Sequence, residues 1–174
     1  DANSNTWTYT YNSYGQMLSI TAPTGSPRGA DVLTYEGDIL SPNYGYLVSQ
    51  ENGIGDEVTY DSYSVLGDLL SVTTYPVTGT TNTTLYEYTP ERRLSQVTHP
   101  DTTTLNYSYT GRDLSSVVDE AGTLMSIANC PTCGQITGVS LPLSKALSWT
   151  LSSDHQVTSY TDAMSNQTTW TYGY

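Results

Sequence analysis

The 174-residue sequence contains no phenylalanine, two cysteines and only five lysine or arginine residues. Against these five stand 17 aspartate and glutamate residues, which gives a net charge of −12. Nucleic acids and anionic membranes require clusters of Lys and Arg in a protein partner, so we expect no nucleic-acid partner. The chain also has no apolar run of about 18 residues and no signal-peptide pattern, and we therefore expect no membrane-spanning segment.

The two cysteines, Cys130 and Cys133, form a C-x-x-C pair. This spacing occurs in redox pairs, in halves of zinc sites and in local disulfides. A structural zinc site needs four ligands, and the other soft candidates, His99 and His155, lie in unrelated parts of the chain. Gly134, not histidine, follows Cys133, which excludes a C-x-x-C-H haem attachment. We favour a disulfide that closes a turn, or a pair of inert thiols, over metal binding or redox catalysis.

The acidic residues are spread singly along the chain. Paired carboxylates could act as general acid and base, but no part of the sequence combines a pair with a recognisable cleft. Calcium could use the oxygen ligands of the turns, yet no loop follows a known calcium-binding spacing. We therefore predict no catalytic, cofactor-binding or metal-binding residues, no cofactor, and a protein that is not an enzyme.

The chain is rich in tyrosine, with 16 residues, and in short repeats. One half of the repeat contains a segment like Leu-Ser-x-Val-Thr, preceded by two or three residues that usually begin with Gly. Its copies start at positions 15, 45, 67, 92, 111, 134 and 154, so that the intervals are 30, 22, 25, 19, 23 and 20 residues. The copy at 45 is degenerate, and those at 134 and 154 are weaker than the others. Internal repeats of about this period are typical of solenoids and arrays.

The other half of the repeat is an aromatic segment of the form Tyr-x-Tyr, at 7–11, 32–35, 58–63, 85–88, 105–109 and 170–174. Large and small residues that alternate at a spacing of two place the rings on one face of a strand and Thr or Ser on the other. Gly, Asn and Asp lie at the joins, where a positive φ is usually needed. Each repeat is therefore predicted to be a β-hairpin.

The pattern predicts an all-β fold of consecutive antiparallel hairpins, paired only with their neighbours, in a spiral or extended sheet. The expected strands are 6–11, 16–21, 31–36, 57–63, 68–73, 84–88, 94–98, 104–109, 114–118, 136–140 and 168–173. One continuous buried layer is expected to contain Trp7, Tyr9, Tyr11, Leu18, Ile20, Leu70, Val72, Tyr86, Tyr88, Leu94, Val97, Tyr107, Tyr109, Leu114, Val117 and Trp170.

The segment Tyr107-Ser-Tyr-Thr-Gly-Arg-Asp-Leu-Ser-Ser-Val-Val-Asp119 resembles the YD repeats, or Rhs repeats, of bacterial surface and toxin proteins and of the animal teneurins. Residues 9–21 are similar, with Asn12 where the family favours Asp. The consensus Arg after Gly is kept at Arg112 and, shifted, at Arg93. The resemblance implies a shell or stalk built from hairpins. The family's self-cleavage motif is not carried over, because the nearest segment, 119–122, lacks its proline.

We expect residues 1–174 to be a single run of about seven such hairpin repeats and a fragment of a longer array. The expected function is a non-enzymatic structural scaffold of an extracellular, secreted or cell-surface bacterial protein, in a shell or a fibre. Its expected partners are further copies of the repeat, adjoining segments of the same protein, glycans or an enclosed toxin domain.

Two alternative functions stay open at this point. One is a carbohydrate-binding or adhesion module, with aromatic glycan contacts at Trp7, Tyr44, Tyr46, Tyr63, Trp149 and Trp170. The other, less favoured, is an enzyme that acts on polysaccharides. Ring exposure separates the first alternative from a scaffold, since a scaffold buries its alternating rings and a glycan binder leaves two or three of them bare.

Overall fold

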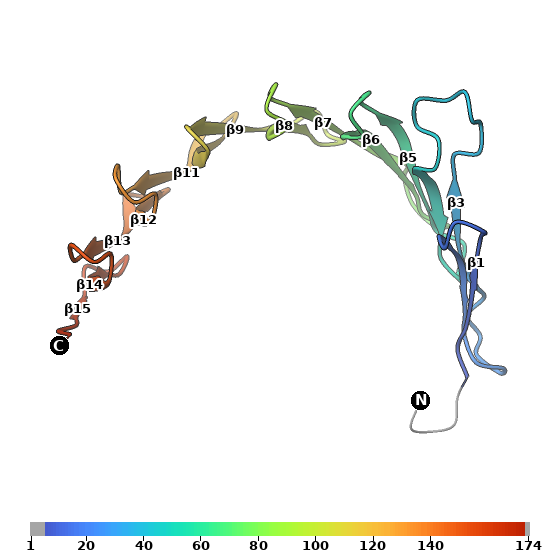
Figure 1. Cartoon of the computed structure of the whole chain (residues 1–174), viewed down its shortest axis with the longest axis horizontal. Helices are drawn as coiled ribbons and strands as arrows, with labels where there is room; N and C mark the ends of the chain where they lie inside the picture. The colour runs from blue at the N-terminus through green and yellow to red at the C-terminus, as the bar shows by residue number, and fades with distance from the viewer. Residues whose placement is uncertain (1–5, 173–174) are drawn as a thin grey trace. The chain divides into compact units, whose positions relative to one another are not determined.

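The computed structural model describes residues 6–172, and in this part of the chain it contains strands and turns but no helix (Figure 1). The strands are β1 (Thr8–Tyr11), β2 (Met17–Thr21), β3 (Asp31–Tyr35), β4 (Leu47–Glu51), β5 (Glu57–Tyr63), β6 (Leu69–Tyr75), β7 (Asn82–Tyr88), β8 (Leu94–Thr98), β9 (Thr104–Thr110), β10 (Asp113–Asp119), β11 (Gly122–Asn129), β12 (Ile136–Leu141), β13 (Lys145–Leu151), β14 (Val157–Thr161) and β15 (Gln167–Thr169).

The order of the strands in the sheet is their order in the chain, from β1 to β15. The described pairs are antiparallel, as in β1 with β2 and β13 with β14. This confirms the prediction of an all-β chain of consecutive hairpins. The chain divides into two compact units: one runs to Arg92 and includes Thr98–Asp101, while the other contains Arg93–Val97 and continues from Thr102.

A β-bulge recurs beside the last residue of the first strand in a hairpin. The register shifts between Thr10 and Tyr11, because Thr10 pairs with Ser19 whereas Tyr11 pairs with Met17. The same shift precedes Tyr35 and Tyr63 in later hairpins. A bulge bends and twists its strand locally, so the repeated aromatic position coincides with a repeated distortion of the ladder.

The hydroxyls of these aromatic residues join successive hairpins. In each case a tyrosine at or near the end of a strand, or just beyond it, donates to the carbonyl of the first residue of the preceding strand; we call this contact the tyrosine clip. Among the described residues, such clips join Tyr35 to Met17 (3.1 Å), Tyr63 to Leu47 (2.5 Å), Tyr109 to Leu94 (2.8 Å) and Tyr172 to Val157 (2.7 Å).

Five of the connecting turns have one hydrogen-bonding pattern. The side-chain oxygen of the first turn residue accepts from the backbone N–H groups two and four residues later, and the residues at this position are Asn12, Asn52, Ser64, Ser152 and Asp162. Such side chains favour turns because they replace a backbone acceptor. The fourth residue of the turn has a positive φ, as at Gly67 (87°) and His155 (60°).

Every strand expected from the sequence is present; 57–63 and 94–98 match at both ends, and the ends of the others differ by at most four residues. The expectation for 168–173 was too long, because β15 ends at Thr169; residue 173 lies outside the described residues. Four strands were not among those expected: β4, β11, β13 and β14. β4 and β14 fall in the degenerate copy at 45 and the weak copy at 154, while β11 and β13 fall outside the repeat copies. Each becomes a strand because it completes a hairpin with a neighbour.

The prediction of one continuous buried layer was wrong. Among the described residues, the buried hydrophobic side chains are Val97 and Val117, at 7% and 8% exposure. Four residues expected in the core are exposed, namely Trp7, Tyr9, Tyr11 and Trp170. The other ten are half-buried. The physical reason is that within each unit the strands form a single layer, with no second layer packed on the sheet (Figure 1).

The other face of the strands carries hydroxyl groups that bond across the sheet. Thr73 bonds to Thr83 at 2.9 Å between hydroxyl oxygens, and Thr150 bonds to Ser159 at 2.7 Å. Thr73 and Ser159 are also buried, like the two valines. Cross-strand Thr and Ser pairs contribute to sheet stability roughly 0.2–1 kcal/mol each, so both faces of this sheet, and not the aromatic face alone, hold it together.

Candidate functional site

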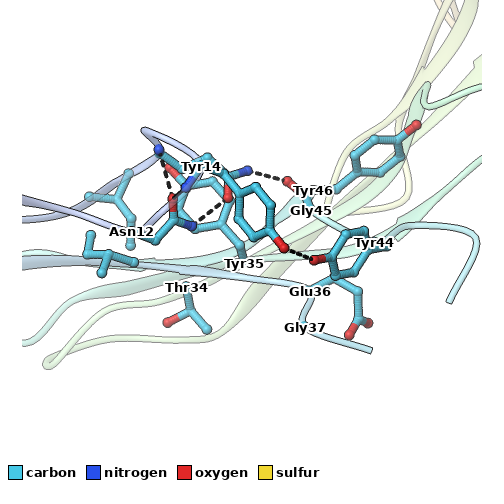
Figure 2. A pocket seen from close by; sticks show the side chains of 12 residues that line it. Asn12, Tyr14, Thr34, Tyr35, Glu36, Gly37, Tyr44, Gly45 and Tyr46 are labelled. Atoms are coloured by element: carbon cyan, nitrogen blue, oxygen red, sulfur yellow. Dashed lines mark hydrogen bonds between the residues drawn. The ribbon is translucent and has the colours of Figure 1, made fainter. Parts of the chain in front are cut away.

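A groove of about 720 Å³ lies in the first unit beside the β1–β2 turn and the β3–β4 connection (Figure 2). We call it the tyrosine groove. It is lined by Asn12, Tyr14, Gln16, Leu18, Leu33, Thr34, Tyr35, Glu36, Gly37, Tyr44, Gly45 and Tyr46.

The first wall of the groove is the β1–β2 turn. Asn12 Oδ1 accepts from the N–H groups of Tyr14 and Gln16, both at 3.0 Å, and Gly15 takes the positive φ of 80° that the turn requires. These bonds involve the backbone of Tyr14 and leave its ring free to project, with 75% of the residue exposed. The hydrogen bonds of the turn therefore do not use the side chain of Tyr14, whose ring projects from it.

The second wall is the connection 36–46, which takes the place of a short turn. It is internally hydrogen-bonded, since Asp38 accepts from Leu40 and Ser41, and Ser41 in turn accepts from Tyr44. Glu36 and Tyr46 continue the strand ladder, because Glu36 N–H donates to the Tyr46 carbonyl at 2.8 Å. The connection therefore holds Tyr44 in a defined place beyond the end of the strands.

Tyr14 and Tyr44, which are 30 residues apart, meet across the groove (Figure 2). The Tyr44 hydroxyl donates to the Tyr14 hydroxyl at 3.1 Å, and the rings meet edge to face, with centroids 6.4 Å apart and planes at 87°. This hydrogen bond, assisted by partial desolvation, raises the pKa of Tyr44 above its ordinary value. Gln16 adds a second tie between the walls, because its Nε2 donates to the Gly45 carbonyl at 2.7 Å.

A further pair of rings extends the aromatic surface from Tyr46. Tyr46 packs against Tyr63 with centroids 5.0 Å apart and planes tilted by 59°. Desolvation in this cluster raises the pKa of Tyr63. The side chain of Tyr63 is therefore held by two contacts: its hydroxyl donates to the Leu47 carbonyl, and its ring packs against that of Tyr46.

The polar side chains that line the groove are amides, hydroxyls and one carboxylate. Glu36 is the one carboxylate among its described lining residues, and none of them is Lys, Arg or His. Glu36 Oε1 accepts from the Asp38 N–H at 2.9 Å, while no described group donates to Oε2. The groove therefore offers flat rings next to an acidic oxygen, without any positive charge.

A second aromatic groove, of about 590 Å³, lies in the second unit and is lined by Trp149, Val157, Tyr160, Trp170 and Tyr172. Trp149 and Tyr160 are register partners on β13 and β14, with ring centroids 5.5 Å apart and planes at 37°. Trp170 and Tyr172 follow β15 and remain substantially exposed. This groove is almost wholly apolar in its side chains.

The residues proposed from the sequence as glycan contacts thus fall into separate places. Tyr44 and Tyr46 line the tyrosine groove, and Tyr63 packs against Tyr46. Trp149 and Trp170 line the second groove. Trp7 is exposed and belongs to neither groove.

The sequence reasoning missed Tyr14, whose ring lines the tyrosine groove and meets that of Tyr44. The signal was its position at the tip of a turn, outside the Tyr-x-Tyr alternation that buries one ring face. It also missed Tyr160 and Tyr172, because their segments are weak copies of the repeat or lie at its edge.

Cys130 and Cys133 are joined in a disulfide in the β11–β12 turn, with Cα atoms 5.4 Å apart. Cys130 N–H bonds to the Gln135 carbonyl at 2.8 Å, so the turn is also closed by its backbone. Among the described residues no three His, Cys, Asp or Glu side chains lie close enough together to hold a metal ion.

Asp61 is the carboxylate with the richest set of hydroxyl partners. Burial raises its pKa, but hydrogen bonds from Thr59, Thr73 and Ser71 outweigh this and hold the pKa below its ordinary value. A general base at neutral pH needs a raised pKa. Asp61 therefore acts as an acceptor that links the hydroxyl face of β5 and β6.

No protein-family model matches the chain, and neither does any curated protein. Solved structures are similar in fold. The crystal structure of TcdB2-TccC3 aligns with a TM-score of 0.55 at 15% identity, over 90% of this chain and 10% of that one. The Photorhabdus luminescens Tc holotoxin pore aligns with a TM-score of 0.54 at 16% identity, over the same two shares. The chain thus spans about a tenth of the length of these neighbours, and the likeness shows the fold.

Proposed function

We propose that the chain is a non-enzymatic structural scaffold of an extracellular bacterial protein, part of a β shell or of a fibre that encloses or presents other domains. The observation that carries this proposal is the repeated linkage of the hairpins. Each strand pairs with its neighbours in the chain, and the tyrosine clip ties one hairpin to the hairpin before it. A structure stabilised by nearest-neighbour terms can be lengthened by repetition.

The likeness in fold to TcdB2-TccC3 and the resemblance of residues 107–119 to YD repeats both support this proposal. A role beside a toxin domain is the finer form of the hypothesis, in which the sheet forms part of the wall around that domain. The composition supports an extracellular location, because charged residues make up 13% of a chain rich in Thr, Ser and Asn.

The proposed partners are further copies of the repeat, supplied by the same protein or by another molecule. Within the described residues, β1 and β15 each pair with a single neighbour, so each has one open side. Open strand edges are templates for another strand. The negative charge of the chain opposes a nucleic-acid partner. The described residues include no helix that is both long and apolar enough to cross a bilayer.

Blocking the open side of β15 tests the scaffold proposal. The Trp170 N–H bonds inward to Thr158, so the N–H of the adjacent residue, Thr169, faces away from β14. Thr169→Pro removes this outward donor and blocks strand addition. Thr169→Ala is the matched control, because it keeps the N–H.

Light scattering on the 174-residue chain should show concentration-dependent end-to-end association that Thr169→Pro abolishes and Thr169→Ala retains. Electron microscopy of the associated material should show extended or curved particles. A strictly monomeric chain at all concentrations, or association that both variants leave unchanged, would contradict extension through this edge.

Carbohydrate binding is the second candidate function, and the tyrosine groove is the observation that favours it. The groove does not depend on the scaffold role, since its walls lie within the first unit.

A further inference from the structure

We propose that the tyrosine groove is a binding site for a neutral oligosaccharide. This inference gives a site and a ligand class to the second candidate function above, and it does not rest on the scaffold proposal. It starts from the place where the repeat is broken. The interval from position 15 to position 45 is 30 residues, the longest in the chain, and two long connections, 22–30 and 36–46, account for the extra length.

The connection 36–46 is not needed to close its hairpin. A four-residue turn such as 12–15 performs the same task between β1 and β2. The longer segment also exposes Ile39 and Leu40, at 76% and 87%. Irregular loops on a regular scaffold are where binding residues concentrate, and this one brings Tyr44 to Tyr14.

The rings form a corner that suits a pyranose. A sugar ring presents C–H groups on its faces and hydroxyls around its edge, so it combines an apolar surface with many donors. Tyr14 and Tyr44 stand at 87° to each other and offer aromatic surface on two sides. Tyrosine contributes such surface with few rotatable bonds, which limits the entropy lost on binding.

The groove is held in shape before any ligand arrives. The hydroxyl bond between Tyr44 and Tyr14 and the bond from Gln16 to the Gly45 carbonyl tie the two walls together. Asn12 Nδ2 in turn donates to Gln16 Oε1 at 2.7 Å and fixes that amide. Preorganisation of this kind lowers the ordering cost of binding.

The charge of the site selects a neutral ligand. Glu36 Oε2 and the Thr34 hydroxyl can accept from sugar hydroxyls, and the carboxylate would repel a uronic acid, a sulfate or a phosphate. The net charge of −12 acts in the same direction. The groove is open to solvent and not enclosed, which fits an extended chain of sugars better than a buried small molecule.

The test is an isothermal titration calorimetry experiment in which the full chain is titrated with neutral oligosaccharides of glucose, galactose, mannose and N-acetylglucosamine. Oligosaccharides of uronic acids and an uncharged tyrosine-rich peptide form the comparison set. We expect at least one neutral oligosaccharide to bind, with a Kd of about 1 mM or lower. If the uronic acid oligosaccharides or the peptide bind more tightly than every neutral oligosaccharide, the proposed ligand class is wrong.

Variants locate the site. The double variant Tyr14→Ala/Tyr44→Ala should bind about tenfold more weakly or worse. Tyr14→Phe/Tyr44→Phe keeps both rings and should stay within about threefold of the parent, although it loses the hydroxyl bond. Tyr75→Ala is the control, because Tyr75 is 42% exposed and lies outside the groove.

The fold of each variant is followed by circular dichroism and urea unfolding. Tyr14→Ala leaves the backbone bonds of its turn intact, so the double variant should keep the parental spectrum. Absence of binding by every neutral oligosaccharide, or parental binding by the folded double alanine variant, would overturn the proposal. Failure of the scaffold proposal would appear in a different experiment, because Thr169→Pro would then leave the association of the chain unchanged.

Discussion

The hydroxyl of Tyr109, near the end of β9, donates to the backbone carbonyl of Leu94, the first residue of β8, at 2.8 Å. Its ring also carries Arg93, from the turn before β8, with the guanidinium carbon 4.6 Å from the centroid. The side chain of Tyr109 thereby connects β9 to the preceding strand and to its turn. This explains the Tyr-x-Tyr pattern better than simple core burial does.

Removal of the Tyr109 hydroxyl should destabilise the protein without altering its fold. Tyr109→Phe leaves the ring in place and deprives the Leu94 carbonyl of its donor, at a cost of about 0.5–1.5 kcal/mol in the free energy of unfolding. Urea denaturation measures the difference. Tyr75→Phe is the control, since no described group bonds to the Tyr75 hydroxyl. An equal effect of both variants would show that the clip contributes nothing.

A clip can be added where the repeat lacks one. Leu151 ends β13 and pairs with Val157, as Tyr109 pairs with Leu114, but it has no hydroxyl to reach Ile136, the first residue of β12. Leu151→Tyr should raise the free energy of unfolding by about 0.5–1.5 kcal/mol. Leu151→Phe supplies the ring alone. If Phe stabilises as much as Tyr in the same unfolding experiment, ring burial and not the hydroxyl is responsible.

The turn residues with positive φ give a paired prediction. His155 has a φ of 60° at the position that Gly67 occupies, with a φ of 87°, in an equivalent turn. His155→Gly should stabilise the chain by up to about 1 kcal/mol, because glycine adopts this region without steric cost. Thermal unfolding followed by circular dichroism measures the change in Tm.

The reverse substitution, Gly67→Ala, should lower Tm, since its Cβ would lie 2.6 Å from the Tyr46 hydroxyl oxygen as well as in a strained backbone region. The two substitutions act in turns with the same bonding pattern. A rise in Tm for Gly67→Ala would contradict the assignment of these turns.

Stability should fall in acid because of three hydrogen-bonded carboxylates. A hydrogen bond from Arg92 lowers the pKa of Asp68, one from Arg28 lowers that of Asp31, and the Val77 N–H lowers that of Asp56. A folded pKa below the unfolded one gives stability that is present above the unfolded value, near 3.8, and is lost as pH falls through the folded value.

Urea midpoints from pH 7 down to pH 2 should therefore decrease, most steeply below about pH 4. Asp68→Asn should flatten part of this profile and weaken its dependence on salt, since Asp68 and Arg92 form an ion pair with 2.7 Å between Oδ1 and the guanidinium nitrogen. A profile that Asp68→Asn leaves unchanged would show that this pair contributes no pH dependence.

The sequence by itself determined the hairpins. Alternation at a spacing of two, as in 105–109, and turn residues such as Asn12 and Gly15 act through neighbouring backbone groups, so their effect is readable locally. Strands such as β4 and β11 lack that local signal. They are strands because a neighbouring strand needs a partner for its backbone groups, which is a property of the sheet.

The tertiary structure alone decided which rings are buried and which two tyrosines meet. Burial depends on the strands that flank a residue, and alternation only says which side of the sheet its ring faces. Tyr9 lies on the edge strand β1, whereas Tyr107 lies on β9, between β8 and β10. Tyr9 and Tyr107 share the same pattern, yet the first is exposed and the second half-buried. The tyrosine groove depends on the path of residues 36–46, whose bonds place Tyr44 against a residue 30 positions earlier. No local periodicity encodes a contact between two turns.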